Sequence, residues 1–166
     1  MPPPGATLYG SDTIAEFERA AQQRFDEGVS LASAGFHGGA IYLHGYVAEM
    51  LLKAAAYKLL GLGSSDPVEE KRPIVEEWIA EYVLAAKKKP RPHDLDAWAR
   101  WLSYFRTDIL GTPYPLSFDL DLGSHKDVIE RIWMPSMRYH QLSPSVMEAA
   151  EVQAAALWFL TQYPNL

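Results

Sequence analysis

The segment 38–60 constrains the fold most, because nearly every one of its residues is apolar or small. At helical spacing these residues form two adjacent apolar stripes, a pattern that predicts burial around most of a helix. Four polar residues keep the segment below the roughly 18 uninterrupted apolar residues of a membrane span. They are His44, Glu49, Lys53 and Lys58. We therefore expect a buried central helix with other helices packed around it.

Capping signals predict further helices on both sides of this segment. Thr13 and Glu16 have the spacing of a capping box, and so do Ser145 and Glu148. Asp94 is suited to cap a helix between them. Helical segments separated by short breaks predict an all-α fold, an up-and-down bundle of about four to five main helices.

The same breaks suggest how the chain is divided. Residues 1–10 are rich in proline and glycine and predict a flexible N-terminal lead, and residues 11–166 predict a single helical domain. Residues 110–124 contain glycine and two prolines and predict a loop. Within it, the alternation over 118–122 predicts a short extended piece. A short helix is expected over 127–133.

Composition excludes several classes of site. The chain has no cysteine, so disulfides, thiolate nucleophiles and cysteine-ligated zinc are excluded. Its five histidines form no HExxH pattern, and it has neither a glycine-rich phosphate loop nor a GxSxG elbow. We therefore expect no cofactor and no metal. No secretory signal is apparent, so we expect a cytoplasmic protein that does not enter a membrane.

The net charge of −6 argues against broad nonspecific binding of nucleic acid, because phosphate contacts need Lys and Arg. The local exception is the basic run Lys87–Lys89. It is either part of a contact surface or a helix end whose cations face the negative pole of the helix dipole.

Polar residues of the central segment share one helical line. Tyr42, Gly45, Glu49 and Lys53 follow one another three or four residues apart. Glu49 and Lys53 have the favourable order for an ion pair on one helix. The pair either stabilises the helix register or faces a groove between the two copies of a dimer. Tyr42 is either a core aromatic or a ligand contact, and His93 either bonds to nearby backbone at a helix start or contacts a ligand.

Three segments together resemble the HEPN superfamily. The first runs from Ala40 to Ala54 and resembles its signature helix, with the Gly45-Tyr46 step followed by Glu49 and Lys53. The second is His93-Asp94-Leu95, which resembles a His-Asp/Asn-Leu step at the start of a later helix. The third is the segment 133–139, which resembles a Trp-x-x-x-x-Arg-Tyr step before the final helix.

The resemblance implies a helix bundle that usually forms a homodimer and takes part in nucleotide or RNA biology. Some members are metal-independent RNases that act as toxins, and others are inert partners of small nucleotidyltransferases. The RNase members use an Arg and a His at a short fixed spacing. Here Arg138 and His140 are separated by a single residue, and Arg131 lies too far from His140 to match.

Three hypotheses follow. The first is a non-catalytic HEPN-like homodimer that binds a nucleotide, RNA, a nucleotidyltransferase or an antitoxin. The second is a metal-independent RNase toxin using Arg138 and His140, supported by Lys87–Lys89. The third is a structural or assembly subunit. The candidate binding residues are Tyr42, Glu49, Lys53, His93, Arg138 and Tyr139, and the Arg138 guanidinium is a candidate partner of Glu49.

Overall fold

The computed structural model describes residues 12–69, 71–83, 93–139 and 143–166. These residues form six α-helices and no β-strand, which confirms the all-α helical bundle. The helices are α1 (Ile14–Ser33), α2 (His37–Leu59), α3 (Arg72–Trp78), α4 (Leu95–Tyr104), α5 (Leu116–Ile132) and α6 (Val146–Gln162). No helix in the described part of the chain is long and apolar enough to cross a membrane. The predicted lead and the run Lys87–Lys89 lie outside the described residues.

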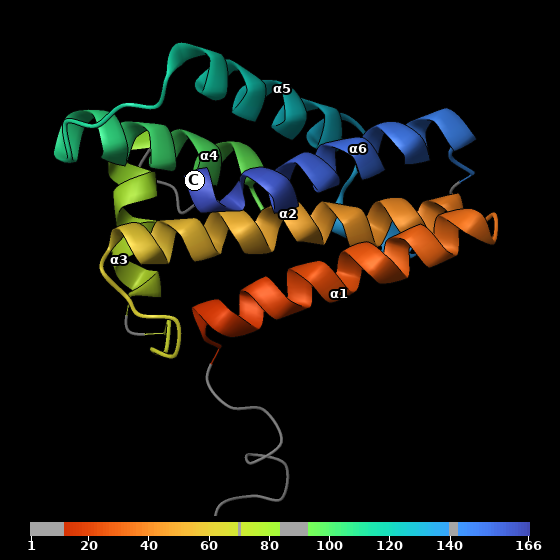
Figure 1. Cartoon of the computed structure of the whole chain (residues 1–166), viewed down its shortest axis with the longest axis horizontal. Coiled ribbons are helices and arrows are strands. Elements are labelled where there is room, and N and C mark those ends of the chain that lie inside the picture. The colour runs from red at the N-terminus through yellow and green to blue at the C-terminus, as the bar shows by residue number, and fades with distance from the viewer. Residues whose placement is uncertain (1–11, 70, 84–92, 140–142) are drawn as a thin grey trace, which may run out of the picture.

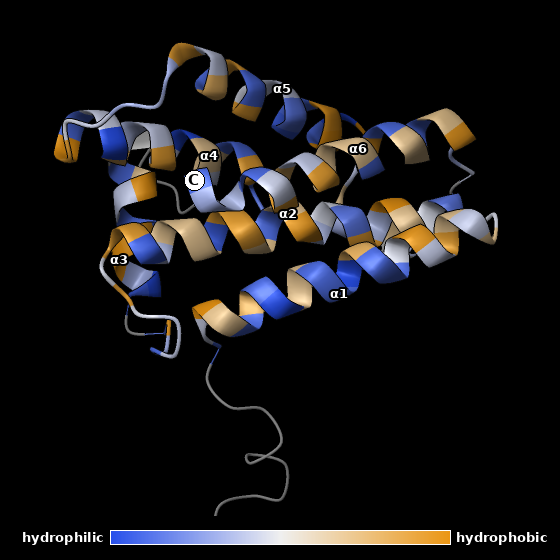
Figure 2. Cartoon of the chain, viewed as in Figure 1, coloured by the Kyte–Doolittle hydropathy of each residue, from blue (hydrophilic) through white to orange (hydrophobic). Residues whose placement is uncertain are grey.

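Helix α2 lies at the centre of the bundle. It runs antiparallel to α1, while α6 lies along its other side and α5 forms the outer edge (Figure 1). Figure 2 shows α2 to be largely hydrophobic, whereas the visible face of α1 is largely hydrophilic. Most α2 side chains from Ala40 to Tyr57 are buried, so the prediction of a buried central helix is confirmed.

The predicted capping signals start three of the helices. Thr13 and Ser145 each accept a hydrogen bond from the backbone of a glutamate three residues later, and each glutamate bonds back to the cap. The Asp94 carboxylate accepts from the Ala97 amide at 3.0 Å and starts α4. These local bonds satisfy amides that a helix N-terminus leaves without partners.

The prediction of a loop over residues 110–124 is right for 110–115 and wrong for 116–124, and the predicted extended piece is wrong. Helix α5 begins at Leu116 and ends at Ile132, so it includes all but the last residue of the short helix expected over 127–133. Leu122 is buried and Phe118 packs between the rings of Tyr114 and Trp158, whereas Leu120 is exposed. The core-facing residues are therefore spaced by four, as in a helix, and Leu120 only imitates the alternation of a strand.

Candidate binding site

A buried carboxylate, that of Glu49, lies at the middle of α2. Only 5% of its side chain is exposed. Lys53 Nζ lies 2.5 Å from Glu49 Oε1, so the predicted ion pair is present. His93 Nδ1 lies 2.6 Å from Glu49 Oε2. Burying a carboxylate is costly unless it is paired, and here each of its oxygens has a partner.

His93 directly precedes the residue that caps α4. Its φ angle is +74°, in the left-handed region that residues other than glycine rarely adopt. Among the described residues, the hydrogen-bond partner of His93 is the Glu49 carboxylate from another helix. This bond connects the start of α4 to α2. Backbone strain of this kind concentrates at functional sites, where surrounding contacts hold it in place.

The bond to Glu49 also determines what His93 presents to a ligand. A neutral imidazole that donates from Nδ1 keeps Nε2 as a hydrogen-bond acceptor. Nε2 makes no hydrogen bond to the described residues, and 32% of the His93 side chain is exposed. The imidazole can therefore accept a hydrogen bond from a ligand, or donate one when it is protonated.

Aromatic rings form a wall beside this imidazole. The Tyr46 ring meets His93 edge-on at 5.7 Å and Trp133 edge-on at 5.4 Å between centroids. Tyr42 lies one turn earlier in α2, with its hydroxyl oxygen 3.3 Å from that of Tyr46. Edge-to-face packing at these distances is favourable, so the wall holds the His93 ring from one side.

Gly45 explains how Trp133 reaches α2. A Cβ atom at Gly45 would lie 2.2 Å from the Trp133 ring, far inside van der Waals contact. Trp133 follows the end of α5, is buried, and donates a hydrogen bond from Nε1 to the Tyr42 carbonyl at 3.1 Å. A glycine is needed at position 45 for close approach of the indole, not for an unusual backbone conformation.

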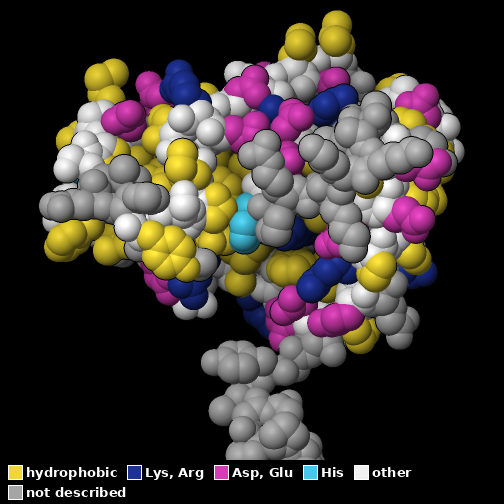
Figure 3. Space-filling view, turned by 180° about the vertical axis from the view of Figure 1, so that it is seen from behind, with side chains coloured by type: hydrophobic (Ala, Val, Ile, Leu, Met, Phe, Trp, Pro, Cys, Tyr) yellow, Lys and Arg dark blue, Asp and Glu magenta, His cyan; other side chains and the backbone are white. Residues whose placement is uncertain are grey.

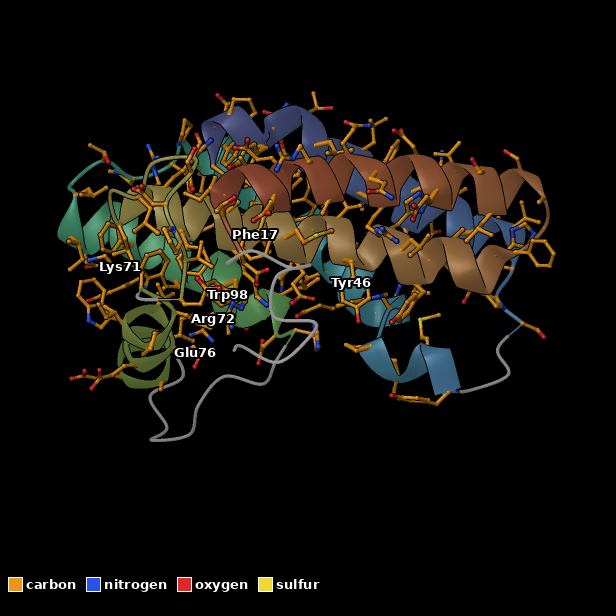
Figure 4. All side chains as sticks on the ribbon, turned by 90° about the horizontal axis from the view of Figure 1, so that it is seen from below. Phe17, Tyr46, Lys71, Arg72, Glu76 and Trp98 are labelled. Atoms are coloured by element: carbon orange, nitrogen blue, oxygen red, sulfur yellow. The ribbon has the colours of Figure 1, made fainter. Side chains whose placement is uncertain are left out.

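On the other side of the cluster, cations and rings continue along α2. Lys53 Nζ lies 5.6 Å from the centroid of the Trp98 ring, and Trp98 packs against Tyr57. Burial raises the pKa of the Tyr57 hydroxyl, and the Arg72 guanidinium acts in the opposite direction. Figure 4 shows Tyr46, Trp98 and Arg72 on the same side of α2. The polar line predicted from sequence thus extends to the start of α3.

The structure brings together four of the predicted binding residues, namely Tyr42, Glu49, Lys53 and His93. Tyr139 ends a 3-10 turn, Pro135–Tyr139, with 73% of its surface exposed. The Arg138 side chain and His140 lie outside the described residues, so the pairing of Arg138 with Glu49 or with His140 stays a prediction.

Two further residues of the site, Tyr46 and Trp133, were not among the predicted binding residues. Both belong to the segments that carry the HEPN resemblance, and this was the one signal that could have selected them.

On the face opposite to Figure 1, histidine and hydrophobic side chains lie next to charged ones (Figure 3). Among the described residues, no group of three or more His, Asp or Glu side chains could hold a metal ion.

The chemistry of the cluster suits an anion or a polar ligand next to aromatic surface. Lys53 supplies a positive charge and His93 a partly exposed imidazole, both bonded to the carboxylate of Glu49. Comparison with known proteins adds no assignment, because no protein-family model, curated protein or solved structure matches this chain.

Proposed function

We propose that this chain is a HEPN-like helical module that binds a nucleotide or RNA and acts as a partner rather than as a nuclease. The observation that carries the proposal is the convergence of the three segments that resemble the superfamily. Glu49 of the first segment bonds to His93 of the second, and Gly45 of the first receives the Trp133 ring of the third. Residues far apart in sequence thus form one polar and aromatic cluster.

The ligand class follows from the groups that the cluster presents. Lys53 supplies a charge-assisted hydrogen bond, which is stronger than a neutral one, to a phosphate oxygen, and the His93 imidazole supplies a further polar contact. The Tyr46 ring packs next to His93, and aromatic rings beside cations are typical of single-stranded nucleic-acid sites. Glu49 holds the Lys53 and His93 side chains in place before the ligand arrives, which reduces the entropy lost on binding.

The test uses a matched pair of lysines on α2. Lys53 pairs with Glu49 and lies near the Trp98 ring, whereas Lys58 pairs with Glu18 at 2.9 Å and lies 4.4 Å from the centroid of the Tyr163 ring. Both lysines therefore combine an ion pair with a ring contact, but only Lys53 belongs to the cluster.

Binding of ATP and of a fluorescein-labelled single-stranded RNA is measured by calorimetry and fluorescence anisotropy at low salt. We expect Lys53→Gln and His93→Asn to weaken binding by about tenfold or more, because each removes a polar contact to the ligand. Lys58→Gln should bind within about twofold of the unsubstituted protein.

If Lys53→Gln and Lys58→Gln weaken binding equally, the Glu49 cluster is not the binding site. Absence of binding by the unsubstituted protein would refute the proposal and favour an assembly subunit. Shortening of the RNA in the presence of EDTA, lost in His140→Ala, would refute the partner role and favour the RNase.

A further inference from the structure

A groove runs between α4 and α5, away from the Glu49 cluster. Its volume is about 350 Å³. Small residues open it, because Ala99 of α4 and Gly123 of α5 both line it and Leu122 lies buried beneath. A Cβ atom built at Gly123 would meet no other atom within 4 Å. A groove between two helices with small residues in it can receive the side chains of a third helix.

Helix α5 also carries two exposed leucines before Gly123. Leu116 and Leu120 are 75% and 64% exposed. With Gly123 they follow one another at four and three residues, so all three lie on one face of α5. Helix α5 itself lies at the outer edge of the bundle (Figure 1). Neighbouring exposed leucines beside a groove are typical of a surface that another protein covers.

The charge of the groove is negative. Arg100 and Lys126 supply two cations, and the Lys126 ammonium is already bound by three carboxylates at 2.8, 2.6 and 3.3 Å. These carboxylates belong to Asp96, Asp127 and Glu130, of which Asp96 and Asp127 line the groove together with a further carboxylate, that of Asp119. Three lining carboxylates against two cations leave one negative charge. The surface therefore complements a positively charged partner.

We propose that this groove docks a basic amphipathic helix of a different protein. The apolar face of that helix covers Leu116 and Leu120 and fills the space over Gly123, while its Lys or Arg side chains pair with the carboxylates. A second copy of this chain is disfavoured as the occupant, since each copy carries a net charge of −6. The proposal is independent of nucleotide or RNA binding at the Glu49 cluster.

The probe is a fluorescein-labelled synthetic peptide with leucines on one helical face and lysines on the other. One control peptide has every lysine replaced by glutamate, and a second has the leucines scrambled around the helix. Gly123→Leu fills the groove, and Ser117→Leu adds the same side chain at an exposed position outside it. Asp127→Asn removes a groove carboxylate, and Asp121→Asn removes an exposed one elsewhere on α5.

We expect the basic amphipathic peptide to bind at least about tenfold more tightly than either control peptide. Gly123→Leu should weaken its binding by about tenfold or more and Ser117→Leu by less than about twofold. Asp127→Asn should weaken binding more than Asp121→Asn, and the difference should shrink at high salt.

Equal binding of the lysine and glutamate peptides would overturn the proposal. So would equal effects of Gly123→Leu and Ser117→Leu, once thermal melting shows that both variants fold. A dimer detected by light scattering and dissociated by Gly123→Leu would also overturn it, because the occupant would then be a second copy.

Discussion

The contact between Gly45 and Trp133 makes a quantitative prediction, because it sets two effects of an alanine against each other. In the interior of a helix, alanine is favoured over glycine by about 1 kcal/mol. At position 45, however, the new Cβ would lie 2.2 Å from ring atoms of Trp133, where normal carbon contacts are about 3.5–4.0 Å. The indole must therefore withdraw by about 1 Å or more.

That withdrawal affects the whole aromatic wall. Trp133 is 4% exposed, contacts Tyr46 and donates to the Tyr42 carbonyl. Overpacking of a filled core costs about 1–3 kcal/mol, and the lost hydrogen bond costs about 1 kcal/mol. After subtracting the gain in helix propensity, Gly45→Ala should lower the free energy of unfolding by about 2 kcal/mol.

The control is Gly123→Ala, also inside a helix, where the added Cβ meets nothing within 4 Å. We expect this variant to gain about 0.5–1 kcal/mol of stability, so the two alanines differ in sign. Urea denaturation followed by far-ultraviolet circular dichroism measures the free energy of unfolding of both variants. In thermal melting, the midpoint temperature of Gly45→Ala should fall by about 4–8 °C. If Gly45→Ala proves as stable as Gly123→Ala, the close contact with the indole does not exist.

Two further predictions concern buried charge. Lys126→Met should lower stability by about 1–2 kcal/mol in urea denaturation, because it leaves three mutually repelling carboxylates that retain partial access to water. If Lys126→Arg keeps the stability that Lys126→Met loses, the loss comes from the missing positive charge and not from altered packing. Burial lowers the pKa of His44, whose Nε2 contacts the Phe25 carbonyl. Below pH 6.5 the folded state therefore binds fewer protons at His44 than the unfolded state does. The contribution of neutral His44 to the free energy of unfolding is complete above pH 6.5 and is lost as pH falls below it. In His44→Gln the free energy of unfolding should depend less on pH below 6.5. An unchanged pH dependence would show that His44 does not cause it.

The parts of the fold that were predictable depend on neighbouring residues. A capping box links residues three apart, and the apolar stripes of α2 repeat every three or four residues, so both can be recognised in the sequence. The Glu49–Lys53 pair is of the same kind. The start of α5 was missed because Leu116 and Leu120 are exposed, so the local pattern did not show which side faces the core.

The sequence by itself determined that this chain forms a helical bundle around α2, because helix formation and helix capping follow from contacts within a few residues. Only the tertiary structure decided what the polar residues of α2 do. His93 lies 44 residues from Glu49, and Trp133 donates to a carbonyl 91 residues away, at Tyr42. Such contacts depend on how the helices pack, and no local periodicity encodes the distance between atoms on different helices.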